Sequence, residues 1–265
     1  MSEYWKDRQA AAQANLTQQS VEQIEARLAK YYMKSSSRVI QSFIDTYNKV
    51  MAGAEKGIEP TPADLYRLES YWAMQGQLKE ELEKLGYSQI AYLNKSFINQ
   101  YIHAYEMVMD IAEDGAFSSV SREAAQQVIN QVWAADGSSW SNRVWKNINQ
   151  LQETLNDELI HCVVTGKKSD DVKRLLTERF NVSYRQADTL VKTELAHIQT
   201  QAAKQRYTDM GVKEVQVWAD EDERRCDVCG KLHKQKYLVY QQMPIPAHPR
   251  CRCCIIPVIE GMDED

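Results

Sequence analysis

The sequence predicts a mainly α-helical protein in which an N-terminal helical bundle and a further helical segment precede a small, cysteine-rich α+β module. Three observations lead to this prediction. Residues 3–52 contain neither glycine nor proline and favour alanine, glutamine, glutamate and lysine, which are good helix formers. Apolar residues recur every three or four positions through most of the chain up to residue 210. Beyond that point the runs become short and alternating, and five of the six cysteines fall within residues 218–256.

The composition is that of a globular protein, and it limits the classes of function. The 265 residues suffice for one large domain or two smaller ones, with 43% apolar and 26% charged residues. A net charge of −5 excludes a polycation that coats DNA along its whole length. No run of about 18 apolar residues occurs, so no membrane-spanning helix is expected. No apolar signal segment is expected at the N-terminus, so nothing argues for an oxidising compartment.

The first region, residues 1–115, is predicted to form a helical hairpin or bundle. Its first helix should cover residues 3–53, with a break or kink at the serines of residues 35–37. A second helix should end at Gly86, and a third should follow with Ser88 as its cap. Short links favour antiparallel neighbours. Tyrosine and tryptophan outside the main apolar stripe indicate a surface for a protein partner.

Residues 116–211 are predicted to be a second helical region. Helices are expected over residues 121–133, in a segment that ends at residue 165, over residues 169–180 and from residue 183 to residue 210. Ser183 and Gln186 match a capping box, which places a helix start at the serine. Gly211 is the expected C-terminal stop. Cys162 lies on an apolar helical stripe and is expected in the core.

The third region, residues 212–260, is predicted to be a small β module. Residues 212–218 alternate apolar and polar side chains, which is typical of a strand. Residues 237–240 and 254–259 are the expected partner strands. Residues 261–265 should be a frayed tail.

Two pairs of soft metal ligands lie in this β module. Cys226 and Cys229 are separated by two residues, as are His248 and Cys251, and eighteen residues lie between the pairs. A two-residue gap lets both side chains of a pair reach one tetrahedral ion, so the spacing predicts a structural Zn2+ site with these four ligands. The apolar residues of the segment are too few to fold it without an ion.

The sequence leaves alternatives to this ligand set open. Cys253 is the first reserve ligand, and His233 and Cys254 are also near enough to substitute. A pair of disulfides or a set of free buried thiols is the other arrangement of these residues. Disulfides are disfavoured, because nothing in the sequence argues for an oxidising compartment.

The same part of the chain resembles a phage protein family. The motifs are Lys192-Thr193-Glu194 in a helix, Trp218, then Asp222-Glu223-Arg224-Arg225-Cys226-Asp227-Val228-Cys229, and finally His248-Pro249-Arg250-Cys251-Arg252-Cys253. In this order they are similar to the C-terminal domain of the Mu F-like head morphogenesis proteins, which are minor head proteins of tailed phages. The resemblance covers about residues 150–258.

The resemblance implies a structural minor capsid protein of the virion interior, made in the host cytoplasm, and not an enzyme. Its implied partners are the portal protein, bound through residues 1–115, the major capsid or scaffold protein, and phage DNA, with no membrane. The implied role is in head assembly and in DNA packaging or ejection. Thr193 and Glu194 are implied to pack against the zinc module.

A second candidate function is a zinc-dependent nuclease or toxin of the His-Asn-His type, which also carries paired Cys-x-x-Cys motifs. Such a catalyst needs an open metal position and a histidine that activates water. Ala247 stands before His248, where that motif prefers an acid, and four ligands saturate a zinc ion. Glu194 and His197 are expected to be an ordinary surface pair on one helix, without a catalytic role.

A third candidate function is a nucleic-acid-binding zinc module. Residues 220–256 contain seven lysines and arginines against five acidic residues, a small local excess of positive charge. The candidate phosphate contacts are Arg224, Arg225, Lys234, Lys236, Arg250 and Arg252.

Overall fold

The computed structural model describes residues 3–54, 61, 63, 66, 69–108, 119–219, 223 and 225–258. The chain divides into two compact units, each built from segments that are distant in the sequence. Unit 1 contains residues 1–25, 93–140 and 189–265, and unit 2 contains residues 26–92 and 141–188. The domain boundaries predicted near residues 115, 211 and 260 follow the chain order and stay a prediction. The predicted tail, residues 261–265, lies outside the described residues.

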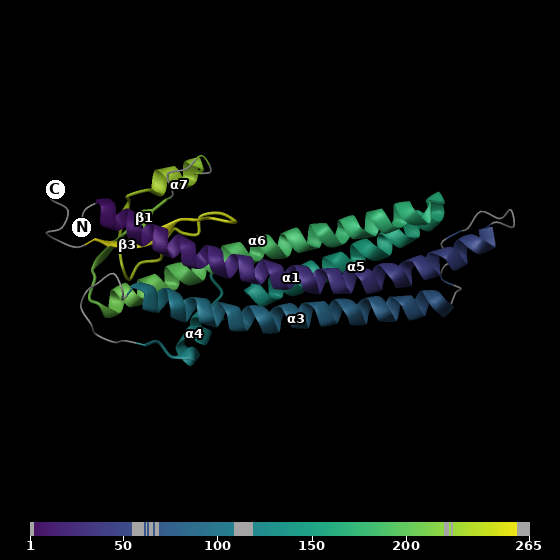
Figure 1. The fold of residues 1–265 in the computed structure, drawn as a ribbon, viewed down its shortest axis with the longest axis horizontal. Helices are drawn as coiled ribbons and strands as arrows, with labels where there is room; N and C mark the ends of the chain where they lie inside the picture. The colour runs from purple at the N-terminus through teal and green to yellow at the C-terminus, as the bar shows by residue number, and fades with distance from the viewer. Residues whose placement is uncertain are drawn as a thin grey trace. The chain divides into compact units, whose positions relative to one another are not determined.

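Long helices make up most of the described chain. In chain order the elements are α1 (Glu3–Ala54), α3 (Glu69–Met107), α4 (Arg122–Ile129), α5 (Trp140–Thr165), α6 (Ser169–Asp209), β1 (Glu214–Trp218), α7 (Asp227–Leu232), β2 (Lys236–Leu238) and β3 (Cys254–Val258) (Figure 1). This order confirms the predicted mainly helical fold with a small sheet near its C-terminal end. None of the described helices combines the length and apolar character needed to cross a membrane.

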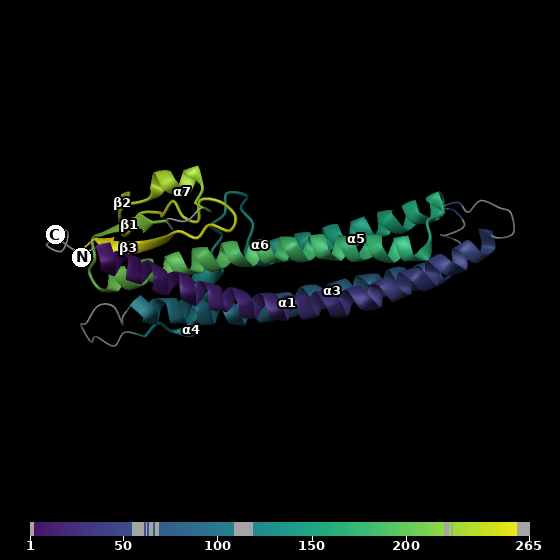
Figure 2. The same cartoon turned by 45° about the horizontal axis from the view of Figure 1, so that its top comes forward.

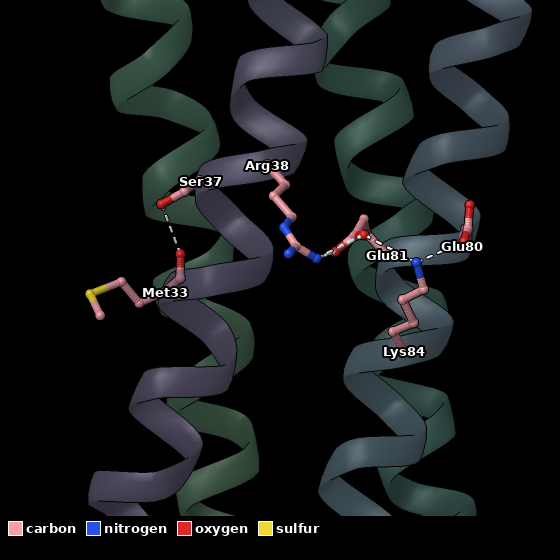
Figure 3. A network of polar contacts seen from close by, with 6 residues as sticks. All are labelled: Met33, Ser37, Arg38, Glu80, Glu81 and Lys84. Carbon is pink, nitrogen blue, oxygen red and sulfur yellow. Dashed lines mark hydrogen bonds and ion pairs between the residues drawn. The ribbon is translucent and has the colours of Figure 1, made fainter.

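In unit 2, α1 and α3 are antiparallel neighbours. Arg38 of α1 forms an ion pair with Glu81 of α3 at 3.1 Å, and Ser42 donates a hydrogen bond to Gln77 at 2.7 Å. Residue numbers therefore increase in opposite directions along α1 and α3. Figure 3 shows the first of these contacts, together with Lys84, which also pairs with Glu81. The side chains packed in this unit include Phe43, Tyr47, Leu78, Leu82, Leu155, Leu159 and Leu176, all fully buried.

The break predicted in the first helix at residues 35–37 is wrong, because α1 is continuous. The hydroxyl groups of Ser36 and Ser37 both donate to the main-chain oxygen of Met33, at 3.0 and 2.9 Å. Figure 3 shows the contact of Ser37. A serine bonded to the preceding turn in this way is compatible with a helix interior. Ser35, the third serine, is buried.

The helix end predicted at Gly86 is also wrong, since α3 runs on through Ser88 to Met107. The glycine serves packing within unit 2. A Cβ atom at residue 86 would lie 2.6 Å from the ring of Trp145 on α5, which is closer than real contacts allow. The missing side chain lets the indole lie against the helix backbone.

A third expected boundary, the helix start at Ser183, is absent because α6 is a single helix. Ser183 is buried in unit 2, where its hydroxyl donates to the side-chain oxygen of Asn147 at 3.0 Å. The Asn147 amide donates in turn to the main-chain oxygen of Ser183 at 2.9 Å. The Ser183 hydroxyl, predicted to cap a helix, therefore links α6 to α5 instead.

Unit 1 contains the three-stranded antiparallel sheet, in the order β2-β1-β3 (Figure 2). The predicted strands are confirmed within one or two residues of their ends for the part that the structure describes. β1 pairs with both neighbours, so that Val215 faces Tyr237 on one side and Val217 faces Ile255 on the other. Both valines are fully buried, which makes β1 the centre of the module.

The beginning of α1 lies beside β3 in unit 1 (Figures 1 and 2), and polar side chains join the two. Gln13 is buried and donates to the main-chain oxygen of Ile255 at 3.2 Å. Gln9, also buried, hydrogen-bonds the hydroxyl of Tyr207 on α6. The first turns of the chain thus complete the core of unit 1.

We predict that Gly86→Ala lowers the free energy of unfolding by about 1–2 kcal/mol, although alanine is the better helix former. The added methyl group overlaps the Trp145 ring. In a Trp145→Ala background the same change should stabilise the protein by up to about 1 kcal/mol, because the steric conflict is gone. Urea unfolding of the four proteins measures both effects, and equal signs in the two backgrounds would contradict the packing role.

Candidate metal centre

The short helix α7 places the first pair of ligands. Cys226 is its N-cap, with φ of −81° and ψ of 162°, and its Sγ accepts a hydrogen bond from the Cys229 amide at 3.4 Å. Cys229 lies one turn later and is buried in the core beside Val215, Val217 and Ile255. Because the two cysteines are about one helical turn apart, both sulfur atoms lie on the same side of α7.

The loop before β3 places the second pair, and α6 holds this loop. Between His248 and Cys251 the chain turns through Arg250, which has a φ of 61°. A non-glycine residue in this left-handed region needs support from its surroundings. Thr193 of α6 accepts a hydrogen bond from the Arg250 amide at 3.1 Å, and Thr189 accepts one from its Nε at 3.0 Å. Thr193 thus packs against the module, as the resemblance implies.

The His248 ring is oriented for metal binding. Its Nδ1 lies 2.8 Å from the main-chain oxygen of Pro249, which can only accept, so Nδ1 carries the proton. The lone pair of Nε2 then points to the sulfur atoms of Cys226 and Cys229, at 3.3 and 3.1 Å. Such a hydrogen bond from the remote nitrogen is the usual way in which a protein fixes a metal-binding histidine.

Three of the separations between candidate ligand atoms are close to those around a tetrahedral ion. Zinc–sulfur bonds of about 2.3 Å require sulfur atoms about 3.8 Å apart, and the Sγ atoms of Cys229 and Cys251 are 3.8 Å apart. A sulfur and an imidazole nitrogen should be about 3.5 Å apart, a few tenths of an ångström more than the distances to His248. The donors are soft, which suits zinc better than calcium or magnesium.

The ligand atoms form two overlapping groups. Within each group all the atoms lie within 4.8 Å of one another. The first group consists of Cys226, Cys229 and His248, and the second consists of Cys229, Cys251 and Cys253. The four predicted ligands are therefore divided between the two groups and do not form a single one. Cys229 belongs to both groups, and the reserve residue Cys253 lies beside Cys251 in the second.

The electrostatics favour thiolates at two positions. Hydrogen bonding from the Cys253 thiol, ahead of all other causes, lowers the pKa of Cys251 to about 5. The amide of Cys229 lowers the pKa of Cys226. Burial raises the pKa of Cys229 to about 12, and the pKa of Cys253 is raised chiefly by its hydrogen bond to Cys251. A metal cation would supply the positive charge that the buried sulfur of Cys229 needs in order to ionise.

Two of the alternative ligands lie in neither group. His233 uses Nδ1 to accept a hydrogen bond from the Ala219 amide at 3.1 Å and packs edge-on against Trp218. Cys254 is buried beside Trp218, Ile256 and Ala10. Cys162 is a fully buried residue of the core in unit 2, as the helical stripe predicted. In the structure every cysteine is a free thiol, so the disulfide alternative finds no support.

Glu194 and His197 are not the surface pair that the sequence predicted. Both are buried in unit 1, because Trp133 covers them. The indole nitrogen of Trp133 donates to the Glu194 carboxylate at 2.9 Å, and its ring stacks on the His197 ring at 4.2 Å. Helical spacing predicted correctly that the two residues share one face of the helix. It could not show that Trp133, which is distant in the sequence, covers this face.

The six basic residues suggested for nucleic-acid contact differ in their surroundings. Arg224 lies outside the described residues. Arg250 is anchored to α6, and Lys234 lies over the Trp218 ring at 5.3 Å. The side chains of Arg225, Lys236 and Arg252 are exposed.

Fold and site together define a mainly helical protein that ends in a small sheet carrying a thiolate and imidazole cluster. Residues 153–256 match the family described as Phage Mu protein F like protein. The match begins within α5 and includes all five candidate ligands, and it confirms the family resemblance for the C-terminal region. The comparisons with curated proteins and with solved structures found no match.

We predict that Cys229→Ser abolishes stoichiometric metal binding, because this sulfur belongs to both groups of ligand atoms. The affinity should fall by more than the roughly 10- to 100-fold that is typical of losing a supporting contact. Cys254→Ser is the matched control, since it changes a neighbouring buried thiol outside both groups. Elemental analysis of the purified proteins gives the metal content, and equal content in the two variants would contradict this assignment.

We also predict that acid releases the metal in two stages. His248 must be neutral to bind, and its pKa is raised above the usual value, chiefly by the carbonyl of Pro249. The pKa of Cys251 is depressed, so the stabilisation from its thiolate is complete above about 8.5 and is lost as the pH falls through about 5. Release to a chromophoric chelator should begin near neutral pH and finish near pH 5. Full retention at pH about 4 would contradict this order.

Proposed function

We propose that this chain is a minor head protein of a tailed phage, which acts in head assembly and in DNA packaging or ejection. The observation that carries the proposal is the family match over residues 153–256, whose end coincides with the ligand cluster. The proposed location is the virion interior, after synthesis in the host cytoplasm.

In this proposal the metal is a structural Zn2+ held by Cys226, Cys229, His248 and Cys251, with Cys253 as the alternative fourth ligand. The ligands come from α7 and from the loop before β3, two segments that only the sheet and α6 bring together. A zinc ion with four protein ligands would cross-link them and has no position left for a substrate. This argues for a structural role and against an enzyme.

The nuclease alternative has little geometric support. A catalytic histidine must be free to take a proton from water, but Nε2 of His248 points to two cysteine sulfurs. His233 is engaged with the Ala219 amide. DNA contact through exposed side chains such as Arg225 and Arg252 is compatible with a head protein, and it forms a secondary part of the proposal.

The proposed main partner is the portal protein, bound through the N-terminal helices. Supporting this, the beginning of α1 exposes aromatic side chains. Tyr4 is 66% exposed and Trp5 is 41% exposed, and Arg8 lies over the Trp5 ring. Exposed aromatic and arginine side chains are typical of the residues that contribute most to protein interfaces. Further proposed contacts are the major capsid or scaffold protein.

The proposal predicts that the chain co-purifies with the portal protein encoded beside it when the two are expressed together. The double change Tyr4→Ala and Trp5→Ala should weaken this complex about tenfold or more, as expected for aromatic residues central to an interface. Tyr240→Ala is the matched control, because Tyr240 is exposed but lies in the loop after β2. Absence of a complex, or equal loss in the control, would contradict portal binding.

A separate assay tests the absence of catalysis. The metal-loaded chain is incubated with double-stranded DNA and a divalent cation, and the DNA is followed on a gel. We expect intact DNA. Cleavage that His248→Ala abolishes would overturn the proposal in favour of the nuclease.

A further inference from the structure

A groove runs between α1 and α3 on the face of unit 2 that these two helices form alone. It consists of two adjoining hollows of about 890 and 280 Å3, which share Arg38, Ser42, Met74 and Gln77. Its floor is apolar, since Val39, Phe43, Met74 and Leu78 are almost fully buried. Its rim is polar. We call it the outer groove.

The α3 rim of the outer groove adjoins an exposed glycine, Gly76, which follows the lining residue Ala73 by three positions. Gly76 lies inside the 39-residue helix α3, in its third turn, although glycine weakens a helix interior relative to alanine. A Cβ atom at residue 76 would meet no described atom within 4 Å, so packing inside the chain gives no reason for the glycine. Ala73, nearly one turn earlier, is exposed as well. Another helix could therefore approach the α3 backbone closely at this point.

Opposite charges lie on the facing rims at each end of the outer groove. Of the exposed charged residues that line it, α1 contributes the cations Arg38 and Lys49 and, between them, the anion Asp45. The α3 side contributes the anions Glu69 and Glu80. The contacts of Arg38 with Glu81 and of Ser42 with Gln77 fix the register, which sets Lys49 level with Ser70, next to Glu69. Figure 3 shows the other end, where Arg38 lies near Glu81 and Lys84 pairs with Glu80.

We propose that the outer groove binds a second copy of this chain, in a two-fold symmetric dimer whose axis runs parallel to α1 and α3. This axis lays α1 of each copy over α3 of the other at the same height. Lys49 of one copy then meets Glu69 of the other, and Arg38 meets Glu80. An axis across the helices at the centre of the groove would instead lay α1 over α1 and set Arg38 of one copy against Lys49 of the other, so the charges favour the first arrangement.

The size of the outer groove suits a reversible dimer. Its α1 wall runs from residue 37 to residue 49, which is about 18 Å of helix. A contact of this length lies near the lower end of specific interfaces, so we expect a salt-sensitive equilibrium in place of a permanent dimer.

Sedimentation equilibrium of the full chain tests the proposal by charge exchange. Lys49→Glu and Glu69→Lys should each weaken the dimer about tenfold, and the double variant should restore it, because the pair is re-formed with its signs reversed. Lys168→Glu, an exposed change outside the groove, is the matched control and should have no effect. A monomer at all concentrations, or a dimer that the double variant does not restore, would overturn the proposal.

Gly76→Leu gives a second test that misfolding cannot imitate. Leucine is a better helix former than glycine and meets open space within the chain, so circular dichroism should show an unchanged or larger helix signal. The dimer should nevertheless be lost, since the side chain blocks the close approach of α1 from the second copy. An unchanged dimer would exclude this surface. Binding of another protein's helix to a monomeric chain would assign the groove to that partner and also overturn the proposal.

Discussion

The C-terminal module depends on bringing two ligand-bearing turns together around the buried sulfur of Cys229. One turn is the start of α7, and the other is the loop before β3. The Sγ atom of Cys229 lies 3.1 Å from the His248 nitrogen and 3.8 Å from the Cys251 sulfur, so it joins the two sets of ligands. Burial of this sulfur among valines and isoleucine couples the ligand cluster directly to the packing of the sheet.

The ligand loop is also tied to α6, whose C-terminal half supports the module. Thr193 accepts a hydrogen bond from the Arg250 amide, which holds a residue in the left-handed region between two ligands. The next residue, Glu194, and His197 about one turn further are covered by Trp133. This helix therefore connects the cluster of candidate ligands to the helical core of unit 1. A metal bound there would stabilise more of the unit than the three strands alone.

Polar groups inside the two units act as links between segments that are distant in the sequence. Gln13 joins α1 to β3, and Asn147 joins α5 to Ser183 of α6. Each such bond has to be made in the correct register, because a buried amide without a partner is costly. Such contacts favour one alignment of long helices whose apolar stripes alone would tolerate sliding.

The sequence by itself determined the helical class, the three strands, the buried position of Cys162 and the segment that holds the ligands. These features follow from the spacing of apolar residues and of ligands over short stretches of the chain, so they can be recognised without knowledge of distant segments. Only the tertiary structure showed that two predicted helix boundaries are absent. Gly86 makes room for the Trp145 ring and Ser183 bonds Asn147, so neither acts as the local boundary that its residue type indicates.

Tertiary structure also decided which of the possible ligands come together. His233 lies four residues after Cys229 and Cys254 three residues after Cys251, so both are near a predicted ligand in the sequence. Of the three reserve residues, however, only Cys253 belongs to a group of ligand atoms. The physical reason is that helix ends and ligand choice depend on partners far along the chain. Spacing shows which side chains can reach one another, and only packing fixes which of them do.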